Sequence, residues 1–197
     1  ELAVIFLSRD IGTEDLLDVA RRHRSPSSVE IETFCPLYIS NECDAECLMC
    51  GMRRFNQNLV RETADSATVK QQLEVLSGRG IRGVALLTGE YQAGPRRREM
   101  LARTASALRE SIARDFGHVL INVGSIEDNE YPELLFDLPR TGDGSLLPHV
   151  TMCTFQETYD PAIYKKFMGS NGTNPRSNFE RRLKNFDRAS RAGIRSA

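Results

Sequence analysis

The sequence lacks long apolar runs and an excess of charge of one sign, and we expect no signal peptide in its opening stretch. None of its apolar stretches approaches the roughly 20 residues that a membrane-spanning helix needs. Lys and Arg number 26 against 27 Asp and Glu, and the net charge of −1 gives no indication of a nucleic-acid partner. The opening stretch Leu2–Leu7 is too short for a signal peptide and has no basic residues before it. With 197 residues, 40 % of them hydrophobic, the chain has the composition of a soluble domain with a real core.

Cysteine is also sparse, but its distribution is uneven. Three of the five cysteines, Cys43, Cys47 and Cys50, fall within eight residues with the spacing C-x3-C-x2-C. Cys35 and Cys153 stand apart and do not extend this motif. Such clustering suits a reducing, cytoplasmic environment better than a secreted disulfide scaffold. The motif therefore indicates a cysteine site rather than a set of structural disulfides.

Three kinds of site remain open for these cysteines. An iron–sulfur cluster is held by Cys thiolates, and three of them on a four-iron cluster would leave one iron free to bind a ligand. A structural zinc ion would need a fourth ligand, and His23, His118 and His149 are all distant in sequence. A disulfide would leave one cysteine over. The residue count favours the iron–sulfur cluster.

The apolar pattern predicts helices and strands in alternation. We expect an N-terminal helical extension over residues 1–28, with a helix at Thr13–His23, and a main domain over residues 29–197. In the main domain we expect strands at 31–40, 84–87, 118–123 and 150–155, and helices at 66–79, 96–114, 131–136, 160–168 and 178–191. Four such βα units predict an α/β fold with parallel strands. Because four strands cannot close a barrel, we interpret the chain as about two-thirds of a six-stranded partial barrel of the (β/α) TIM type.

Polar motifs follow each predicted strand. They are Asn41–Cys50, Thr88–Tyr91, Gly124–Asp128 and Gln156–Tyr159. In parallel α/β folds, chemistry gathers at the carboxyl ends of the strands. The final Ala192-Gly-Ile194 is typical of a loop leading into another strand, and we expect one to follow.

These motifs resemble those of a known enzyme group, the radical S-adenosylmethionine (SAM) enzymes, and within it the aromatic amino-acid lyases. The similarity rests on the cysteine spacing and on four further segments: Pro36–Asn41, Thr88–Glu90, Phe155–Tyr159 and Arg182–Ile194. It runs from about residue 30 to the end of the chain. The family includes the tyrosine lyases of thiamine biosynthesis and of [FeFe]-hydrogenase cofactor maturation. It also includes the tryptophan lyases, which make 3-methyl-2-indolic acid for thiopeptides such as nosiheptide.

The resemblance implies two cofactors and an electron donor. Cys43, Cys47 and Cys50 would hold a [4Fe–4S] cluster, whose open iron chelates S-adenosyl-L-methionine. An external one-electron reductant would then drive cleavage of this cofactor to a 5′-deoxyadenosyl radical. The implied fold is the radical SAM partial barrel.

The resemblance also assigns roles to individual side chains. Glu90, in Thr88-Gly89-Glu90, would meet the methionyl ammonium, Gly89 would allow close backbone approach, and Arg182 would hold the cofactor carboxylate. The other expected cofactor contacts are Met49, Ser125 and Glu157, and Tyr38 would face the substrate. Four of these residues also have a purely structural interpretation: a solvent-exposed strand-end acid for Glu90, a surface arginine for Arg182, a bond to a neighbouring loop for Glu157 and a core tyrosine for Tyr38.

The substrate is expected to be L-tryptophan. The tyrosine lyases tend to carry Asn and Tyr within the cysteine motif, where this chain has Asp44-Ala-Glu46 and Met49. Tyrosine Cα–Cβ cleavage is the alternative activity, and a zinc-stabilised binding module without redox chemistry is the alternative from another class.

Overall fold

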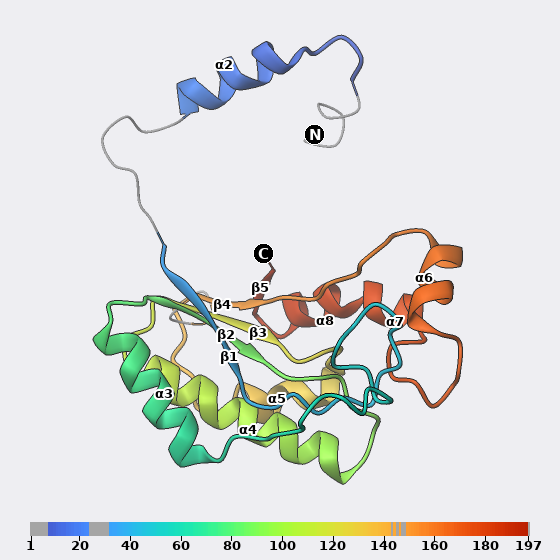
Figure 1. Ribbon diagram of the computed structural model, residues 1–197. Coiled ribbons are helices and arrows are strands. Elements are labelled where there is room, and N and C mark those ends of the chain that lie inside the picture. The colour runs from blue at the N-terminus through green and yellow to red at the C-terminus, as the bar shows by residue number, and fades with distance from the viewer. Residues whose placement is uncertain (1–7, 24–31, 143, 145, 147–148, 197) are drawn as a thin grey trace. The chain divides into compact units, whose positions relative to one another are not determined.

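The computed structural model describes residues 8–23, 32–142, 144, 146 and 149–196, arranged in two units (Figure 1). The units divide between Ile31 and Glu32. The described part of the first contains helix α2 (Thr13–His23), with acids in its first turn and basic residues in its last, as the helix dipole favours. This helix matches the sequence prediction. The expected features at Leu2–Leu7 and Ser25–Ser28 lie outside the described residues.

The second unit is built on a parallel five-stranded sheet in the order β1-β2-β3-β4-β5. The strands are β1 (Phe34–Tyr38), β2 (Gly83–Leu87), β3 (His118–Asn122), β4 (His149–Met152) and β5 (Arg195–Ser196). The first four confirm the predicted strands, and β5 is the strand expected after Ala192-Gly-Ile194. Sequential order with parallel pairing confirms the α/β fold built from repeated βα units.

Helices connect the strands. They are α3 (Ser66–Gly78), α4 (Pro95–Ile112), the 3-10 turn η1 (Asp128–Glu130), α5 (Tyr131–Leu134), α6 (Pro161–Met168), α7 (Phe179–Leu183) and α8 (Asn185–Arg191). Aspartates cap two of them: Asp65 accepts a hydrogen bond from Thr68 N in α3, and Asp160 accepts from Ala162 N in α6.

Two predicted elements differ from the structure. The single helix expected over 178–191 is two helices, because the chain leaves helical geometry at Lys184, where ψ is 3°. Asn185 then begins α8 with a fully buried side chain that binds Ile126 N and Thr154 Oγ1. The fourth strand ends at Met152 rather than at Phe155; Cys153 N still donates to Ile121 O of β3 at 2.9 Å.

The core lies between the sheet and the helices that cover it. Strand β2, which has a neighbouring strand on each side, contributes Val84, Ala85 and Leu86, all buried, as expected of a continuously apolar parallel strand. Helices α3 and α4 add Leu73 and Leu108 to the same cluster. None of the helices within the described residues is long and apolar enough to span a membrane.

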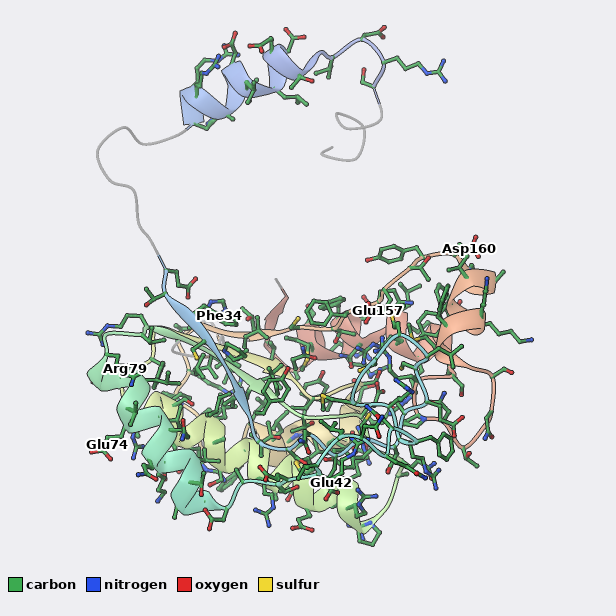
Figure 2. The ribbon with its side chains drawn as sticks, viewed as in Figure 1. Phe34, Glu42, Glu74, Arg79, Glu157 and Asp160 are labelled. Atoms are coloured by element: carbon green, nitrogen blue, oxygen red, sulfur yellow. The ribbon has the colours of Figure 1, made fainter. Side chains whose placement is uncertain are left out.

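The strands all run toward one end of the sheet. Figure 1 shows the long loop after β1 and helices α6 and α7 gathered at that end. In Figure 2, Phe34 marks the start of β1, while Glu42 and Glu157 lie toward the opposite end. The polar motifs that follow the strands therefore meet at one edge, as the sequence predicts.

Candidate cluster and cofactor site

The loop that carries the three cysteines is held by side chains rather than by regular structure. Asn41 joins the start of this loop to the segment 60–62: its Nδ2 donates to Val60 O at 2.8 Å, and its Oδ1 accepts from Glu62 N at 2.7 Å. Arg61 crosses the loop and donates to the carbonyls of Asn41, Met52 and Arg53 at 2.7 to 2.9 Å. These bonds give partners to loop carbonyls that belong to no helix or strand.

All three cysteines line one cavity of about 200 Å³ at the carboxyl ends of β1 and β2. They are free thiols. Backbone amides point at two of the sulfurs: Cys43 Sγ accepts from Glu90 N at 3.3 Å and from Ala45 N at 3.4 Å, and Cys50 Sγ accepts from Met52 N at 3.4 Å. Amide donors of this kind favour a thiolate over a thiol.

Burial works in the opposite direction on the same thiols. It raises the pKa of Cys43, and it raises the pKa of Cys47 to about 11 although the nearby charge of Arg176 lowers it. A ligating cysteine must be a thiolate, so a metal centre bound here displaces protons. The positive charge of Arg176 favours that step at Cys47.

The donor set fits an iron–sulfur cluster with one open iron. Within the described residues, no three His, Cys, Asp or Glu side chains are arranged to hold a single metal ion. A four-iron cluster has a different requirement, because its thiolates bind different irons. Three free thiols on one cavity wall, two of them receiving amide hydrogen bonds, meet that requirement.

Gly89 brings the loop after β2 against the cysteine loop. A Cβ at this position would lie 2.1 Å from the carbonyl oxygen of Glu42 and 2.5 Å from Cys43 Cβ. Only glycine allows this approach. Two backbone contacts depend on it: Asp44 N donates to Glu90 O at 2.9 Å, and Glu90 N points at Cys43 Sγ.

We expect Gly89→Ala to destabilise the protein and to reduce the iron it retains. Overpacking of this kind typically costs about 1–3 kcal/mol, and displacement of Cys43 would disturb the cluster site. Thermal unfolding and iron content after anaerobic reconstitution measure both effects. Gly78→Ala is the matched control, since no atom lies within 4 Å of its added Cβ and Ala favours the helix. Equal stability and iron content in the two variants would contradict the close-approach argument.

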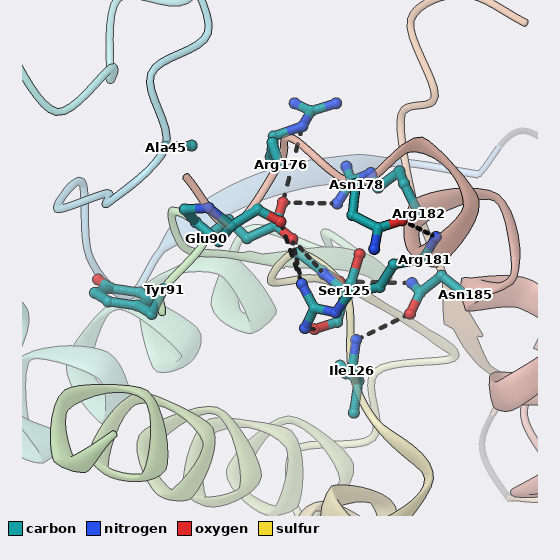
Figure 3. Close-up of polar contacts among 12 residues, drawn as sticks. Ala45, Glu90, Tyr91, Ser125, Ile126, Arg176, Asn178, Arg181, Arg182 and Asn185 are labelled. Carbon is teal, nitrogen blue, oxygen red and sulfur yellow. Dashed lines mark hydrogen bonds and ion pairs between the residues drawn. The ribbon is translucent and has the colours of Figure 1, made fainter. Parts of the chain in front are cut away.

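Glu90 is the centre of a buried charge cluster (Figure 3). Glu90 and Arg182 are each only 4 % exposed, and Arg182 Nη1 donates to Glu90 Oε2 at 3.0 Å. Arg181 Nη1 lies 3.6 Å from Oε1, and Arg176 Nε lies 3.8 Å from Oε2. Ser125 N also donates to Oε1, at 3.2 Å. These contacts fix the direction of the Glu90 carboxyl group.

The two residues predicted to contact opposite charges of the cofactor therefore contact each other. Besides Glu90, Arg182 donates from Nε and Nη2 to Phe155 O at 3.3 and 3.1 Å. Each of its three nitrogens thus has a partner within the protein. Arg182 lines the cavity from α7, and its surface-arginine reading is wrong.

The remaining predicted residues divide into two groups. Tyr38, Gly89 and Glu157 line the cavity with the cysteines. Tyr38 is 55 % exposed, so it is not a core tyrosine. Met49 is 54 % exposed and Ser125 is fully buried, and neither is part of the cavity lining. Ser125 reaches Glu90 through its backbone amide.

Sequence reasoning missed several polar residues in and near the cavity, among them Arg53 and Asn122 of its lining. Arg176 lines it from the loop after α6, Arg181 forms a close ion pair with Glu127, and Asn185 binds the backbone that leads from Ser125. Arg176 stands in a Gly/Asn/Pro-rich loop that reads as a simple connection. Only the folded chain places its guanidinium beside Glu90 and Cys47.

Comparison with curated proteins finds similarity to the 2-iminoacetate synthases of Escherichia coli (strain K12) and Salmonella typhimurium. The chain is 30 % and 28 % identical to them over 165 residues, or 83 % of its length. It spans 38 % of the length of each relative. No protein-family model matches the chain.

Solved structures with a similar fold include two that overlap most of this chain. The FeFe-hydrogenase maturase HydG from Carboxydothermus hydrogenoformans aligns with a TM-score of 0.66 at 24 % identity, covering 83 % of this chain and 34 % of that one. Methylornithine synthase (PylB) aligns with a TM-score of 0.63 at 17 % identity, covering 98 % and 52 %. The chain is thus similar to the 2-iminoacetate synthases over most of its own length, and it has the fold of the corresponding part of HydG and PylB, a partial barrel of (β/α) units.

Proposed function

We propose that the protein is a radical SAM lyase acting on an aromatic L-amino acid. The observation that carries the proposal is the shared cavity. Three free thiols, the Glu90 carboxylate and three guanidinium groups line it at the carboxyl ends of the strands. Thiols suit a [4Fe–4S] cluster, and a carboxylate beside guanidiniums suits the zwitterionic end of S-adenosyl-L-methionine.

In this proposal Cys43, Cys47 and Cys50 hold the cluster. Bound together, the cluster and S-adenosylmethionine would supply a 5′-deoxyadenosyl radical once an external reductant provides one electron. The chain's own residues position the groups: Gly89 allows the two loops to meet, and Glu90 presents its carboxyl group at the cavity lining. The protein thereby orients the bound groups and shields the radical, while the cofactors carry out the radical chemistry.

The relatives favour tyrosine as the substrate. The name 2-iminoacetate synthase describes a product that keeps the nitrogen, the α-carbon and the carboxylate of an amino acid. Breaking the Cα–Cβ bond of an aromatic amino acid with oxidation of the amine gives such a product. We therefore place Cα–Cβ cleavage of L-tyrosine first.

Tryptophan is the second candidate. The departure of Asp44-Ala-Glu46 and Met49 from the tyrosine-lyase pattern favours it. The implied reaction would begin with hydrogen abstraction from the tryptophan amine and end in 3-methyl-2-indolic acid for thiopeptide biosynthesis. The structure adds a separate role for Asp44, whose carboxylate binds Arg96 at 3.0 Å and Gln92 N at 3.1 Å.

Product analysis tests both candidates in one experiment. The whole protein, reconstituted anaerobically, is given S-adenosylmethionine, a reductant and either L-tyrosine or L-tryptophan. p-Cresol from tyrosine supports the first candidate, and 3-methyl-2-indolic acid from tryptophan supports the second. Zinc retention without 5′-deoxyadenosine formation under any condition would overturn the proposal in favour of a zinc-binding module.

We expect Tyr38→Phe to uncouple cofactor cleavage from product formation. Tyr38 lies at the end of β1 on the cavity wall with its side chain half exposed. Loss of its hydroxyl removes one polar contact while the ring stays, and radical abstraction depends steeply on substrate position. Measured together, 5′-deoxyadenosine should persist while product per cofactor falls about tenfold, as for loss of one hydrogen bond of roughly 1.4 kcal/mol. An unchanged ratio would remove Tyr38 from the substrate side of the site.

A further inference from the structure

Arg97 is a buried arginine outside the cysteine loop and outside the cavity lining. It lies in the first turn of α4 and is 5 % exposed. Its Nε and Nη2 each lie 2.5 Å from a carboxylate oxygen of Glu130, which ends η1. Burial acts to raise the pKa of Glu130, but the Arg97 guanidinium holds that pKa below its ordinary value. A buried ion pair is in itself weak evidence of a stabilising role, so the other contacts of Arg97 indicate what it does.

The other donors of Arg97 hold two backbone carbonyls near Glu90. Nη1 donates at 3.3 Å to the carbonyl oxygen of Tyr91, the residue that follows Glu90. Nη2 donates at 2.5 Å to the carbonyl oxygen of Ser125. Tyr91 belongs to the loop after β2 and Ser125 to the loop after β3, and these two strands are neighbours in the sheet. A planar guanidinium with five donors in fixed directions is suited to joining two such loops.

The loop after β3 is shaped around the carboxyl group of Glu90. Gly124 has a φ of 85°, and a Cβ at this position would lie 2.6 Å from Cγ of Glu90. The next residue, Ser125, donates from its backbone N to Glu90 Oε1 at 3.2 Å (Figure 3). Only glycine leaves this space free without strain. The direction of the Glu90 carboxyl group therefore depends on where this loop lies.

Helices α7 and α8 hold the same loop from another side. Asn185 Oδ1 accepts from Ile126 N at 2.9 Å, and Arg188 Nε donates to Ile126 O at 2.6 Å. Arg97 differs from both in its reach. Within the part of the chain that the structure describes, it is the side chain that bonds the backbone of both loops, at Tyr91 and at Ser125. It therefore sets the spacing between Glu90 and the amide that orients it.

We propose that Arg97 is a positioning residue, which holds the Glu90 carboxyl group in the direction that an ammonium group in the cavity requires. The inference rests on the proposed function, which supplies this ammonium as the α-amino group of S-adenosylmethionine. Arg97 is not part of the cavity lining, so its effect on the ligand passes through Glu90 and Ser125. Charge-assisted hydrogen bonds depend on geometry, and a displaced carboxyl group would bind the ammonium less tightly.

The test asks whether Arg97 acts through Glu90. Equilibrium binding to the anaerobically reconstituted protein is measured for S-adenosylmethionine and for its analogue in which hydrogen replaces the α-amino group. The variants are Arg97→Gln, Arg97→Lys, and Arg97→Gln combined with Glu90→Gln. Arg98→Gln is the matched control, because Arg98 is the next residue of the same helix and is exposed. Iron and sulfide content verify that each variant carries its cluster.

One further variant guards against a loss of folding. Arg97→Gln leaves Glu130 without its cation, and breaking a buried pair from one side is strongly destabilising. Arg97→Gln/Glu130→Gln removes both charges and should be more stable than Arg97→Gln. It still lacks the guanidinium that joins the two loops, so it should show the same weakening of cofactor binding.

Arg97→Gln should weaken S-adenosylmethionine binding by about tenfold, the lower end of the range for one charged hydrogen bond, because the carboxyl group is displaced and not lost. The analogue without the amino group should bind this variant and the wild type equally. Arg97→Lys should recover part of the loss. In the Glu90→Gln background, Arg97→Gln should have little further effect, because the group that it positions is already gone.

Equal losses for the two ligands would show a general structural role and overturn the inference. An Arg97→Gln effect that adds in full to that of Glu90→Gln would overturn it as well. Unchanged affinity in Arg97→Gln or in Arg97→Gln/Glu130→Gln, or the absence of a cluster from every Arg97 variant, would do the same. A wild-type protein that carries its cluster but does not bind S-adenosylmethionine would instead overturn the proposed function.

Discussion

Replacing any one of Cys43, Cys47 and Cys50 with Ala is expected to abolish cluster binding and activity together. Each supplies one of three thiols on the cavity wall, and an iron–sulfur cluster held by two thiolates would be neither stable nor open at a single iron. Iron and sulfide content and the visible absorbance of the cluster give the measurement independently of turnover. Loss should be complete within detection.

Cys35→Ala and Cys153→Ala are the matched controls. Both are free and partly buried, and neither lines the cavity with the other three. These variants should keep the cluster. Loss of iron from Cys35→Ala would show that a fourth protein thiolate closes the cluster, and an open iron would then be excluded.

Glu90→Gln is expected to have the second large effect, on stability as well as on the cofactor. Arg182 would keep its buried charge but lose the carboxylate that neutralises it at 3.0 Å. Breaking a buried pair from one side typically costs about 3–5 kcal/mol. Affinity for S-adenosylmethionine should fall as well, by about 10- to 150-fold for one charged hydrogen bond. Thermal unfolding and equilibrium binding measure the two losses.

A second substitution separates those losses. In Glu90→Gln/Arg182→Met no unpaired charge remains on Arg182, so much of the stability should return while cofactor affinity stays low. Glu99→Gln is the control, because Glu99 forms an exposed i,i+4 pair with Arg103 that should contribute about 0.3–0.5 kcal/mol. A Glu90→Gln protein with wild-type stability and cofactor affinity would contradict both roles of this carboxylate.

The local pattern of the sequence predicts the fold well because local physics decides it. The apolar run Val84–Leu87 between helical segments predicts a strand buried on both faces, and β2 is such a strand. The Ala192-Gly-Ile194 turn predicts another strand, and β5 follows it. The break at Lys184 escaped prediction because Asn185 is used by Ile126 and Thr154, which are distant in sequence.

The polar site is less accessible to sequence reasoning. Glu90 and Arg182 are each predicted to line the site. Their mutual hydrogen bond is not predicted, because the two residues are 92 positions apart and neither local sequence indicates the other as its partner. Met49 lies beside Cys50 in sequence, yet its side chain is exposed and is not part of the cavity lining. Arg176 has no local motif at all. Only the folded structure places its guanidinium near Glu90 and Cys47.

The contacts across Gly89 couple the cysteine loop to the loop that carries Glu90. Asp44 N donates to Glu90 O, and Glu90 N donates to Cys43 Sγ, so neither loop can shift without straining the other. Binding of the metal centre and binding of S-adenosylmethionine are then thermodynamically coupled. If the bound metal centre raises the affinity for S-adenosylmethionine by some factor, bound S-adenosylmethionine raises the affinity for the metal centre by the same factor. A ligand that keeps the second loop in place should therefore slow the escape of iron to a chelator. The order in which the protein acquires its two cofactors would change the rate of assembly and leave the final state the same.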